Sequence, residues 1–264
     1  MKQLYIDPDI SKAETLPGSF YHDTTIFESM KDRIFASSWQ WIGDKRLNSL
    51  PNSTYPFYLL DGYLNEPMVL IRSADDTLRC LSNVCTHRGN IVVHNPGSAK
   101  FLTCMYHGRR FKQDGTFVSM PEFSLTENFP RPCDNLHQFD LVEWGPFLFT
   151  GISPRFELRN ILSIMNERIG FLPLDEFIHK PTLGKEYLVN AHWALYCDNY
   201  LEGFHIPYVH QDLNSVLDYG LYTTELYDYF NVQIGYAKDG EECFILPEGH
   251  PDYGKSIAAY YYWI

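Results

Sequence analysis

The feature that most constrains this chain is a pair of short segments in which a cysteine is closely followed by a histidine. One residue separates Cys85 from His87, two separate Cys104 from His107, and sixteen residues lie between the segments. Each segment offers one thiolate and one imidazole from a turn. Two such loops can clamp a binuclear iron–sulfur cluster, with both cysteines on one iron and both histidines on the other.

A zinc site is the main competing interpretation, because zinc accepts two cysteines and two histidines in tetrahedral geometry. The flanking residues favour the cluster. Gly89 and Gly108 follow the histidines where ligand loops turn sharply, and Asp114-Gly115 predicts a hairpin after the second loop. Neutral imidazoles in place of two thiolates also raise the reduction potential. The pattern therefore predicts a Rieske [2Fe–2S] centre, a one-electron relay, held by Cys85, His87, Cys104 and His107.

A second pattern contains two histidines, His205 and His210, which would point about 140° apart on a regular helix. Pro207 lies between them and disfavours a continuous helix, so both imidazoles can aim at one point. Glu202, three residues before His205, is expected on the same helix face, where it can hydrogen-bond the imidazole. Two imidazoles and a carboxylate suit Fe(II) and dioxygen chemistry. An isolated histidine pair is weak evidence for a metal, but here it accompanies the cluster pattern.

These motifs resemble those of one family. CTHRG at Cys85–Gly89 and CMYHG at Cys104–Gly108 look like the Rieske domain of ring-hydroxylating oxygenase α subunits. Asp198–His210 is similar to the iron-binding helix of the same family, and its likeness is greatest to the choline and carnitine monooxygenase branch. Many members have Pro and Trp where Met105 and Arg109 stand here, a departure that affects local packing and the docking surface for a redox partner.

The resemblance implies an α+β chain, with an all-β Rieske domain and a helix-grip catalytic domain that is incomplete at its C-terminus. His205 and His210 would bind the mononuclear iron. Glu202 would bridge toward the cluster of a neighbouring subunit, and Asn199 is grouped with it as a catalytic residue. The family's carboxylate ligand has no match here, so it is expected beyond Ile264 or is missing. Nothing selects one of the nearby acids Asp212, Asp218, Glu225 and Asp228.

Changes of pattern divide the chain into an N-terminal helical segment (1–37), the Rieske domain (38–153) and the catalytic domain (154–264). Short apolar runs between turn residues predict strands at Tyr55–Leu60, Met68–Arg72, Thr77–Val84, Phe101–Cys104, Thr116–Val118 and Phe147–Thr150. Two later strands are expected at Thr182–Asn190 and Ser256–Ile264. Helices are expected around Phe27–Phe35, from Pro154 to Gly170, and from His192.

Composition excludes some functions. The chain has 33 acidic and 21 basic residues, and this formal charge of −12 argues against a nucleic-acid partner. The N-terminus lacks the pattern of a signal peptide and no apolar run is long enough to span a membrane, so a cytoplasmic protein is expected. The remaining cysteines, Cys80, Cys133, Cys197 and Cys243, are expected to be buried thiols.

The resulting hypothesis is an oxidoreductase, a Rieske mono- or dioxygenase, working as a homotrimer. A ferredoxin or flavin reductase would supply electrons, and Fe(II) with O2 would hydroxylate an aromatic ring or a quaternary ammonium compound. Five aromatic residues could line a pocket that holds a quaternary ammonium group by cation–π contact: Tyr219, Tyr222, Tyr227, Tyr229 and Phe230. Aromatic residues of this kind more often belong to the core of a sheet. The alternatives are a Rieske electron carrier without oxygenase activity and an inactive oxygenase-like protein.

Overall fold

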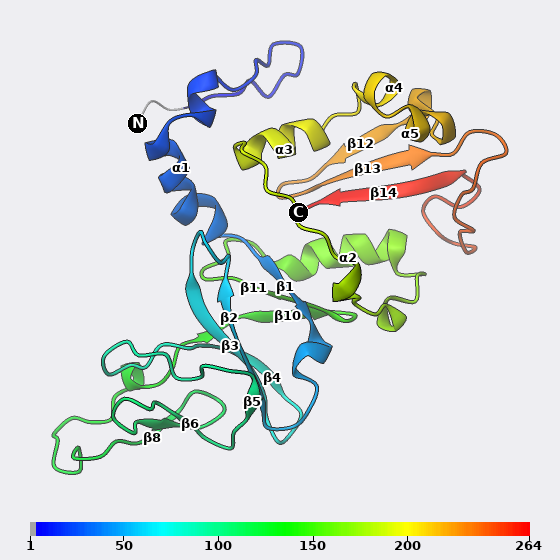
Figure 1. Cartoon of the computed structure of the whole chain (residues 1–264). Coiled ribbons are helices and arrows are strands. Elements are labelled where there is room, and N and C mark those ends of the chain that lie inside the picture. Colours follow the sequence, from blue (N-terminus) through cyan, green and yellow to red (C-terminus); the bar gives the residue numbers. More distant parts are fainter. Residues whose placement is uncertain (1–3) are drawn as a thin grey trace. The chain divides into compact units, whose positions relative to one another are not determined.

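The computed structural model describes residues 4–264, which form two compact units (Figure 1). The first unit contains Met30–Leu158 and Leu174–His179. The second contains the described residues up to Ser29, together with Arg159–Pro173 and Lys180–Ile264. The described N-terminal residues therefore group with the C-terminal part of the chain.

The first unit is built from antiparallel sheets. Its strands are β1 (Gln40–Asp44), β2 (Ser53–Leu59), β3 (Glu66–Arg72), β4 (Leu78–Ser82), β5 (Gly97–Ser98), β6 (Leu102–Thr103), β7 (Arg110–Phe111), β8 (Phe117–Ser119), β9 (Gln138–Phe139), β10 (Leu141–Trp144) and β11 (Phe147–Thr150). They form a five-stranded sheet in the order β5-β2-β3-β4-β9 and two three-stranded sheets, β1-β11-β10 and β6-β7-β8. The all-β domain expected from the sequence is confirmed.

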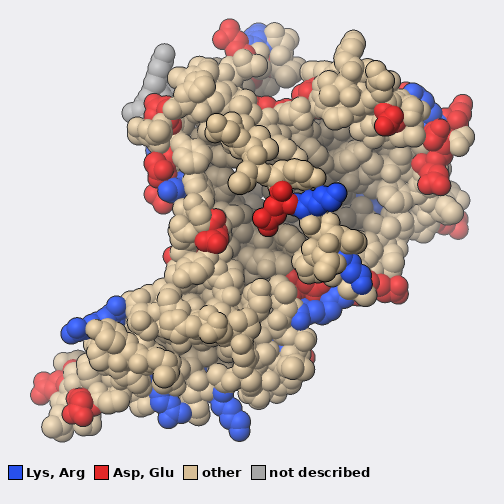
Figure 2. All heavy atoms as spheres, viewed as in Figure 1, with Lys and Arg blue, Asp and Glu red and all other residues tan. Residues whose placement is uncertain are grey.

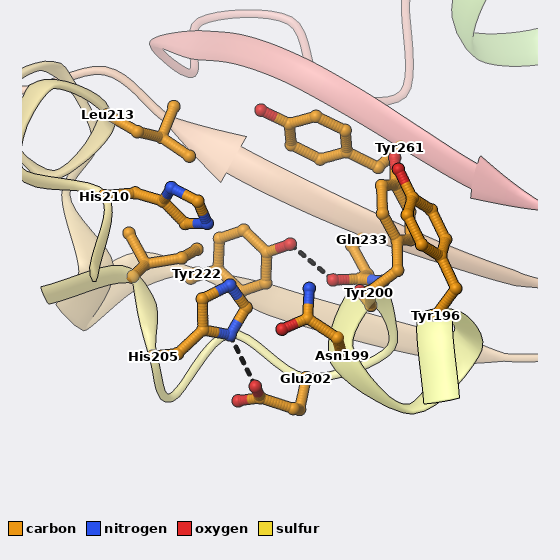
Figure 3. A pocket seen from close by; sticks show the side chains of 11 residues that line it. Tyr196, Asn199, Tyr200, Glu202, His205, His210, Leu213, Tyr222, Gln233 and Tyr261 are labelled. Carbon is orange, nitrogen blue, oxygen red and sulfur yellow. Dashed lines mark hydrogen bonds and ion pairs between the residues drawn. The ribbon is translucent and has the colours of Figure 1, made fainter. Parts of the chain in front are cut away.

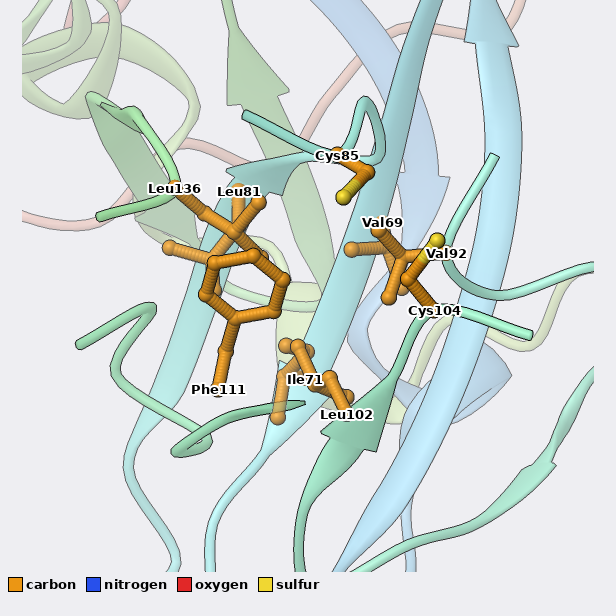
Figure 4. Close-up of a cluster of buried hydrophobic side chains, with 9 residues drawn as sticks. All are labelled: Val69, Ile71, Leu81, Cys85, Val92, Leu102, Cys104, Phe111 and Leu136. Atoms are coloured by element: carbon orange, nitrogen blue, oxygen red, sulfur yellow. The ribbon is translucent and has the colours of Figure 1, made fainter. Parts of the chain in front are cut away.

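Strand β3 explains where the core of this unit sits. Its residues from Met68 to Ile71 are all buried, because β3 is central in the five-stranded sheet and both faces are covered. Side chains alternate between faces along a strand, so Met68 and Leu70 join one apolar cluster and Val69 and Ile71 join another. The second cluster also contains Cys85 and Cys104, as Figure 4 shows. The core thus reaches the two cysteines of the cluster motif.

The second unit combines helices with one antiparallel sheet, which confirms the α+β class. Helix α1 (Thr24–Met30) belongs to this unit up to Ser29, and the π-helical turn at Lys31–Phe35 that follows it belongs to the first unit. The other elements are α2 (Leu158–Ile169), α3 (Trp193–Tyr200), α4 (Ile206–Val209), α5 (Gln211–Val216), β12 (Thr223–Leu226), β13 (Asn231–Tyr236) and β14 (Ile257–Trp263). The strand order is β12-β13-β14, and Figure 1 shows α3, α4 and α5 beside this sheet.

Most of the predicted strands and helices are present, but the strand expected at Thr182–Asn190 is wrong. That segment holds only a short 3-10 turn at Pro181–Leu183 and then irregular chain. The side chains from Tyr187 to Val189 are exposed. Strand propensity depends on burial against neighbouring strands, and this exposed segment pairs with no strand.

Two of the four cysteines expected to be buried thiols are exposed, which corrects that expectation. Cys80 is buried in the core and Cys197 is partly buried, whereas Cys133 and Cys243 face solvent. Cys133 lies in a 3-10 turn and Cys243 in the irregular chain between β13 and β14, where neither residue has a core to pack against.

The charged residues are distributed without a basic stripe on the face that Figure 2 shows. Lys and Arg side chains there are scattered among acidic and uncharged ones. This distribution agrees with the formal charge of −12 and gives no footprint for a phosphate backbone. Among residues 4–264, none of the helices has the length and apolar character needed to cross a membrane.

Candidate metal centres and their pocket

The two loops of the cluster motif share one backbone conformation. In the first loop, the Cys85 N–H donates to the Asn90 carbonyl at 2.8 Å, and the Gly89 N–H donates to the Cys85 carbonyl at 3.0 Å. The second loop repeats both bonds, at 2.8 and 2.9 Å, between Cys104 and the residues five and four positions later. Each cysteine is therefore followed by the same tight turn, which presents its histidine.

A glycine in the left-handed region closes each turn. Gly89 has φ of +73° and Gly108 has φ of +71°, a conformation that costs glycine little and other residues more. The sequence prediction that these glycines allow sharp turns is confirmed.

The loops bring the four motif residues together in two pairs. Cys85 and Cys104 are buried and their thiols are close enough to hydrogen-bond each other. The rings of His87 and His107 lie 4.9 Å apart, centroid to centroid, and nearly perpendicular. Two sulfurs on one side and two imidazoles on the other are the donor set of a Rieske cluster, in which each iron takes two protein ligands. The residues present therefore fit the cluster.

The surroundings of the Cys104 sulfur favour the thiolate that a metal requires. Burial by itself would raise the pKa of Cys104, but the Tyr106 backbone N–H, the Cys85 thiol and the Asn90 amide, 3.6 Å from the sulfur, lower it below its usual value. Next to this sulfur, the side chains of Met105 and Tyr106 are exposed at the tip of the loop.

The second histidine pair lies at a cavity of about 280 Å³ in the second unit (Figure 3). His205 and His210 flank helix α4 at its two ends, and their ring centroids are 5.0 Å apart. The two imidazoles therefore lie close together at one pocket, as the sequence predicted. Pro207, expected to break a helix, instead begins one, because it lies in the first turn of α4, where proline is tolerated.

Glu202 contacts His205 as expected, but from a loop and not from a shared helix face. Helix α3 ends at Tyr200, so the chain at Glu202 is free to turn back on itself. One carboxylate oxygen lies 2.5 Å from His205 Nδ1, and the other accepts the Phe204 backbone N–H. Burial would raise the pKa of Glu202, but these hydrogen bonds lower it, so the group stays ionised. With Nδ1 donating to Glu202, Nε2 of His205 is the nitrogen left for a metal.

Tyrosines form much of the pocket wall. Tyr196 and Tyr200 come from α3, Tyr261 from β14, and Tyr222 from the chain just before β12. The Tyr222 hydroxyl donates to the buried Gln233 side chain at 2.5 Å, and Gln233 donates in turn to the Tyr200 carbonyl at 3.0 Å. This chain of bonds fixes the orientation of the Tyr222 ring, which Figure 3 shows facing the histidines.

Of the aromatic residues expected around a pocket, Tyr222 lines this one. Tyr227 and Phe230 instead stack on each other, with centroids 4.3 Å apart. Asn199 lines the pocket as well. Sequence reasoning missed Tyr196, Tyr200 and Tyr261. The spacing of the first two, four residues apart on a helix, was a usable signal.

Glu202 contacts His205 Nδ1, the ring nitrogen turned away from a metal, and two of the other nearby acids have partners elsewhere. Glu225 pairs with Arg168 at 2.8 Å, and the Asp218 carboxylate accepts the Gly220 N–H. Within the part of the chain that the structure describes, no group of three or more His, Cys, Asp or Glu side chains is placed to hold a metal ion. The two imidazoles and their pocket thus fit part of a 2-His-1-carboxylate iron site, without its third ligand among residues 4–264.

Comparisons with known proteins identify the Rieske domain and find relatives that cover most of the chain. Residues 44–130 match the family model of the Rieske [2Fe-2S] domain. The chain is 27% identical over 264 residues to the chloroplastic choline monooxygenase of Arabidopsis thaliana, covering 90% of this chain and 59% of the relative. It is 29% identical to the oxygenase subunit of carnitine monooxygenase from Escherichia coli K12, covering 90% and 63%. The chain spans about three fifths of the length of these curated relatives.

A solved structure gives the same picture at the level of the fold. The chain aligns with a quaternary ammonium Rieske monooxygenase at a TM-score of 0.66 and 26% identity, over 89% of this chain and 64% of that one. The first unit thus contains a Rieske [2Fe–2S] domain, and the two cysteine–histidine loops are part of it. The chain as a whole is similar to the α subunits of the Rieske non-haem iron oxygenases. This similarity implies a [2Fe–2S] cluster and a mononuclear iron.

Proposed function

We propose that this chain is the oxygenase component of a Rieske oxygenase, which hydroxylates a small organic substrate at a mononuclear Fe(II). The observation that carries the proposal is the meeting of His205 and His210 at a tyrosine-lined pocket, in a chain that also has a Rieske domain. A Rieske electron carrier would need only the domain and would leave this pocket and its histidine pair without a role.

The roles divide between the two sites. Cys85, Cys104, His87 and His107 hold the cluster, and His205 with His210 holds the iron. Bound there, the two metals supply one-electron transfer and dioxygen activation. The protein's own contribution is to place the ligands, with Glu202 holding the His205 ring by its Nδ1 proton. Asn199, at the pocket wall, orients the substrate. A ferredoxin or flavin reductase provides the electrons.

A quaternary ammonium compound is the favoured substrate. Aromatic faces attract such cations, and the pocket wall carries four tyrosines, Tyr196, Tyr200, Tyr222 and Tyr261. Two similar proteins are named for choline and carnitine. An aromatic-ring substrate is the second candidate, because the same rings would stack on it. The cavity of about 280 Å³ suits a small molecule of either kind.

Metal counting tests the reaction class. Reconstituted protein should bind about three irons per chain, two in the cluster and one at the histidine pair, whereas a carrier or an inactive relative should bind about two. His205→Ala and His210→Ala should each lose the single iron and keep the cluster. Colourless protein containing zinc in place of the cluster would overturn the proposal.

Thermal shifts test the substrate class. Choline, carnitine and betaine should raise the melting temperature more than simple aromatic acids do. Tyr222→Leu should lose that shift, while Tyr253→Leu, which changes an exposed tyrosine outside the pocket, should keep it. A shift with aromatic acids alone would select the second candidate.

We also propose a homotrimer in which the cluster of one subunit serves the iron of the next. Inter-subunit electron transfer is described for the similar quaternary ammonium Rieske monooxygenase, and head-to-tail contacts that close produce rings. Light scattering of the active protein should give a trimer. Full turnover by a monomer would contradict this arrangement.

A further inference from the structure

Arg109 is a buried cation just behind a cluster loop. It follows His107 by two residues, and only 2% of its surface is exposed. One guanidinium nitrogen, Nη2, lies 2.8 Å from Asp134 Oδ1, and the Asp134 side chain is almost as deeply buried. Burying such a pair is expensive, and apolar side chains of similar volume often serve stability as well or better. The buried charges therefore point to a role other than stability.

The guanidinium is enclosed by aromatic rings. Its central carbon lies 4.9 Å from the ring centroid of Phe117, 5.5 Å from that of Phe129 and 5.7 Å from that of Phe111. The Arg109 Nε has no hydrogen-bond partner among the described residues. Because the Arg109 side chain is buried, its charge is screened less than a surface charge and acts over a longer distance.

Asp134 connects this pair to both loops of the cluster motif. Its main-chain oxygen accepts one hydrogen bond from Arg109 Nη2, at 3.1 Å, and another from the Thr86 hydroxyl, at 2.8 Å. Thr86 stands between Cys85 and His87 in the first loop. In the second loop, the Cys104 N–H donates to the carbonyl of Arg109. One carbonyl group, that of Asp134, thus ties the two ligand loops together.

We infer that Arg109 and Asp134 are positioning residues that tie the cluster loops together and set the cluster's reduction potential through their opposite charges. Reduction adds one negative charge to the cluster. The Arg109 cation favours that state, and the Asp134 carboxylate opposes it. The inference rests on the cluster of the Rieske domain and not on the proposed oxygenase reaction.

Charge-removing variants should move the potential in opposite directions. Arg109→Gln removes the cation and leaves the carboxylate uncompensated, so the potential should fall. Asp134→Asn should raise it, because the cation then acts alone. The double variant should lie near the wild type. A redox titration of the reconstituted protein followed by EPR measures this, and a tenfold change in the reduction equilibrium corresponds to about 59 mV for one electron.

A control variant at Arg110 tests whether the effect on the potential requires a buried charge. Arg110→Gln removes the neighbouring cation, which is exposed and lies over the Phe101 ring, and should leave the potential almost unchanged. Arg109→Lys should stay closer to the wild type than Arg109→Gln, since it keeps the positive charge.

Asp134→Asn keeps the inference testable if Arg109→Gln does not assemble a cluster. An asparagine oxygen can still accept the Arg131 N–H, which is 2.7 Å from the present carboxylate, so this variant should fold. A lowered or unchanged potential in Asp134→Asn would overturn the inference, as would shifts of the same sign in both single variants. The titration uses no substrate or dioxygen, so a protein that proves inactive as an oxygenase leaves its result valid.

Discussion

Among single residues at the candidate iron site, Glu202 is held by hydrogen bonds to both of its carboxylate oxygens. Its carboxylate holds His205 Nδ1 with one oxygen and the Phe204 N–H with the other. The first contact selects the tautomer in which Nε2 is free, and the second keeps the carboxylate from rotating. Because both of its oxygens already accept hydrogen bonds, Glu202 is better suited to orient a ligand than to serve as one.

We therefore predict that Glu202→Gln keeps the mononuclear iron and the cluster but reduces single-turnover rate by about 10- to 100-fold. The amide has the same shape but lacks the charge that fixes the imidazole. Iron content and rate should be measured on the same samples, with Glu248→Gln, an exposed glutamate, as the control. Loss of iron would make Glu202 a ligand, and an unchanged rate would make it a bystander.

At the scale of elements, the two cluster turns are alike in backbone but not in surroundings. Gly89 and Gly108 share the left-handed conformation. A Cβ added at Gly89 would meet no atom within 4 Å, whereas one at Gly108 would lie 3.3 Å from Pro121 Cγ. The second turn therefore has less space for a side chain at its glycine than the first.

From this difference we predict unequal effects of alanine. Gly89→Ala should destabilise its unit by about 1–2 kcal/mol, the cost of a left-handed alanine, and still assemble the cluster. Gly108→Ala should cost more and lower the cluster content, because the turn must move away from Pro121. Visible absorbance per chain and urea unfolding provide the measurements. Equal losses in the two variants would show that the Pro121 contact is unimportant.

At the scale of the whole molecule, a charged network stabilises the second unit. Arg168 of α2 pairs with Glu225 of β12 at 2.8 Å and lies 3.5 Å from Asp252. Asp252 is buried and also accepts hydrogen bonds from Lys255 and from Tyr260 of β14, both at 2.7 Å. The network connects a helix to both edge strands of the sheet beside the pocket.

The same network predicts a dependence of stability on pH. Burial raises the pKa of Asp252, but the hydrogen bonds from Lys255 and Tyr260 bring it below its usual value of about 3.9. A carboxyl with a lowered folded pKa contributes stability above its unfolded pKa, and that contribution is lost as pH falls through the folded pKa. Acidification below about pH 4 should therefore destabilise the unit.

Asp252→Asn should cost about 1–3 kcal/mol of unfolding free energy at neutral pH and should flatten the acid dependence. Urea unfolding followed by tryptophan fluorescence measures both effects. Asp239→Asn, at an exposed aspartate, should change neither. If the stability of Asp252→Asn falls as steeply at low pH as that of the wild type, other carboxylates cause the acid dependence.

The sequence by itself was enough to single out the six candidate metal ligands and the class of fold. Each ligand pair is local in the chain, and metal chemistry restricts both the residue types and their spacing, so Cys85, His87 and His205 could be recognised without a fold. The glycines that close the cluster turns were readable for the same reason. Central strands such as β3 were predicted because a strand buried on both faces is a continuous apolar run.

Only the tertiary structure decided which distant side chains meet. Gln233 and Tyr261 reach the pocket because β13 and β14 pair in a register that aligns them, and register depends on contacts between segments far apart in the chain. The Arg109–Asp134 pair joins residues 25 positions apart, and no local sequence pattern predicts this contact. The segment 182–190 stays irregular because it pairs with no neighbouring strand, and strand pairing is a property of the folded chain that propensity alone does not contain.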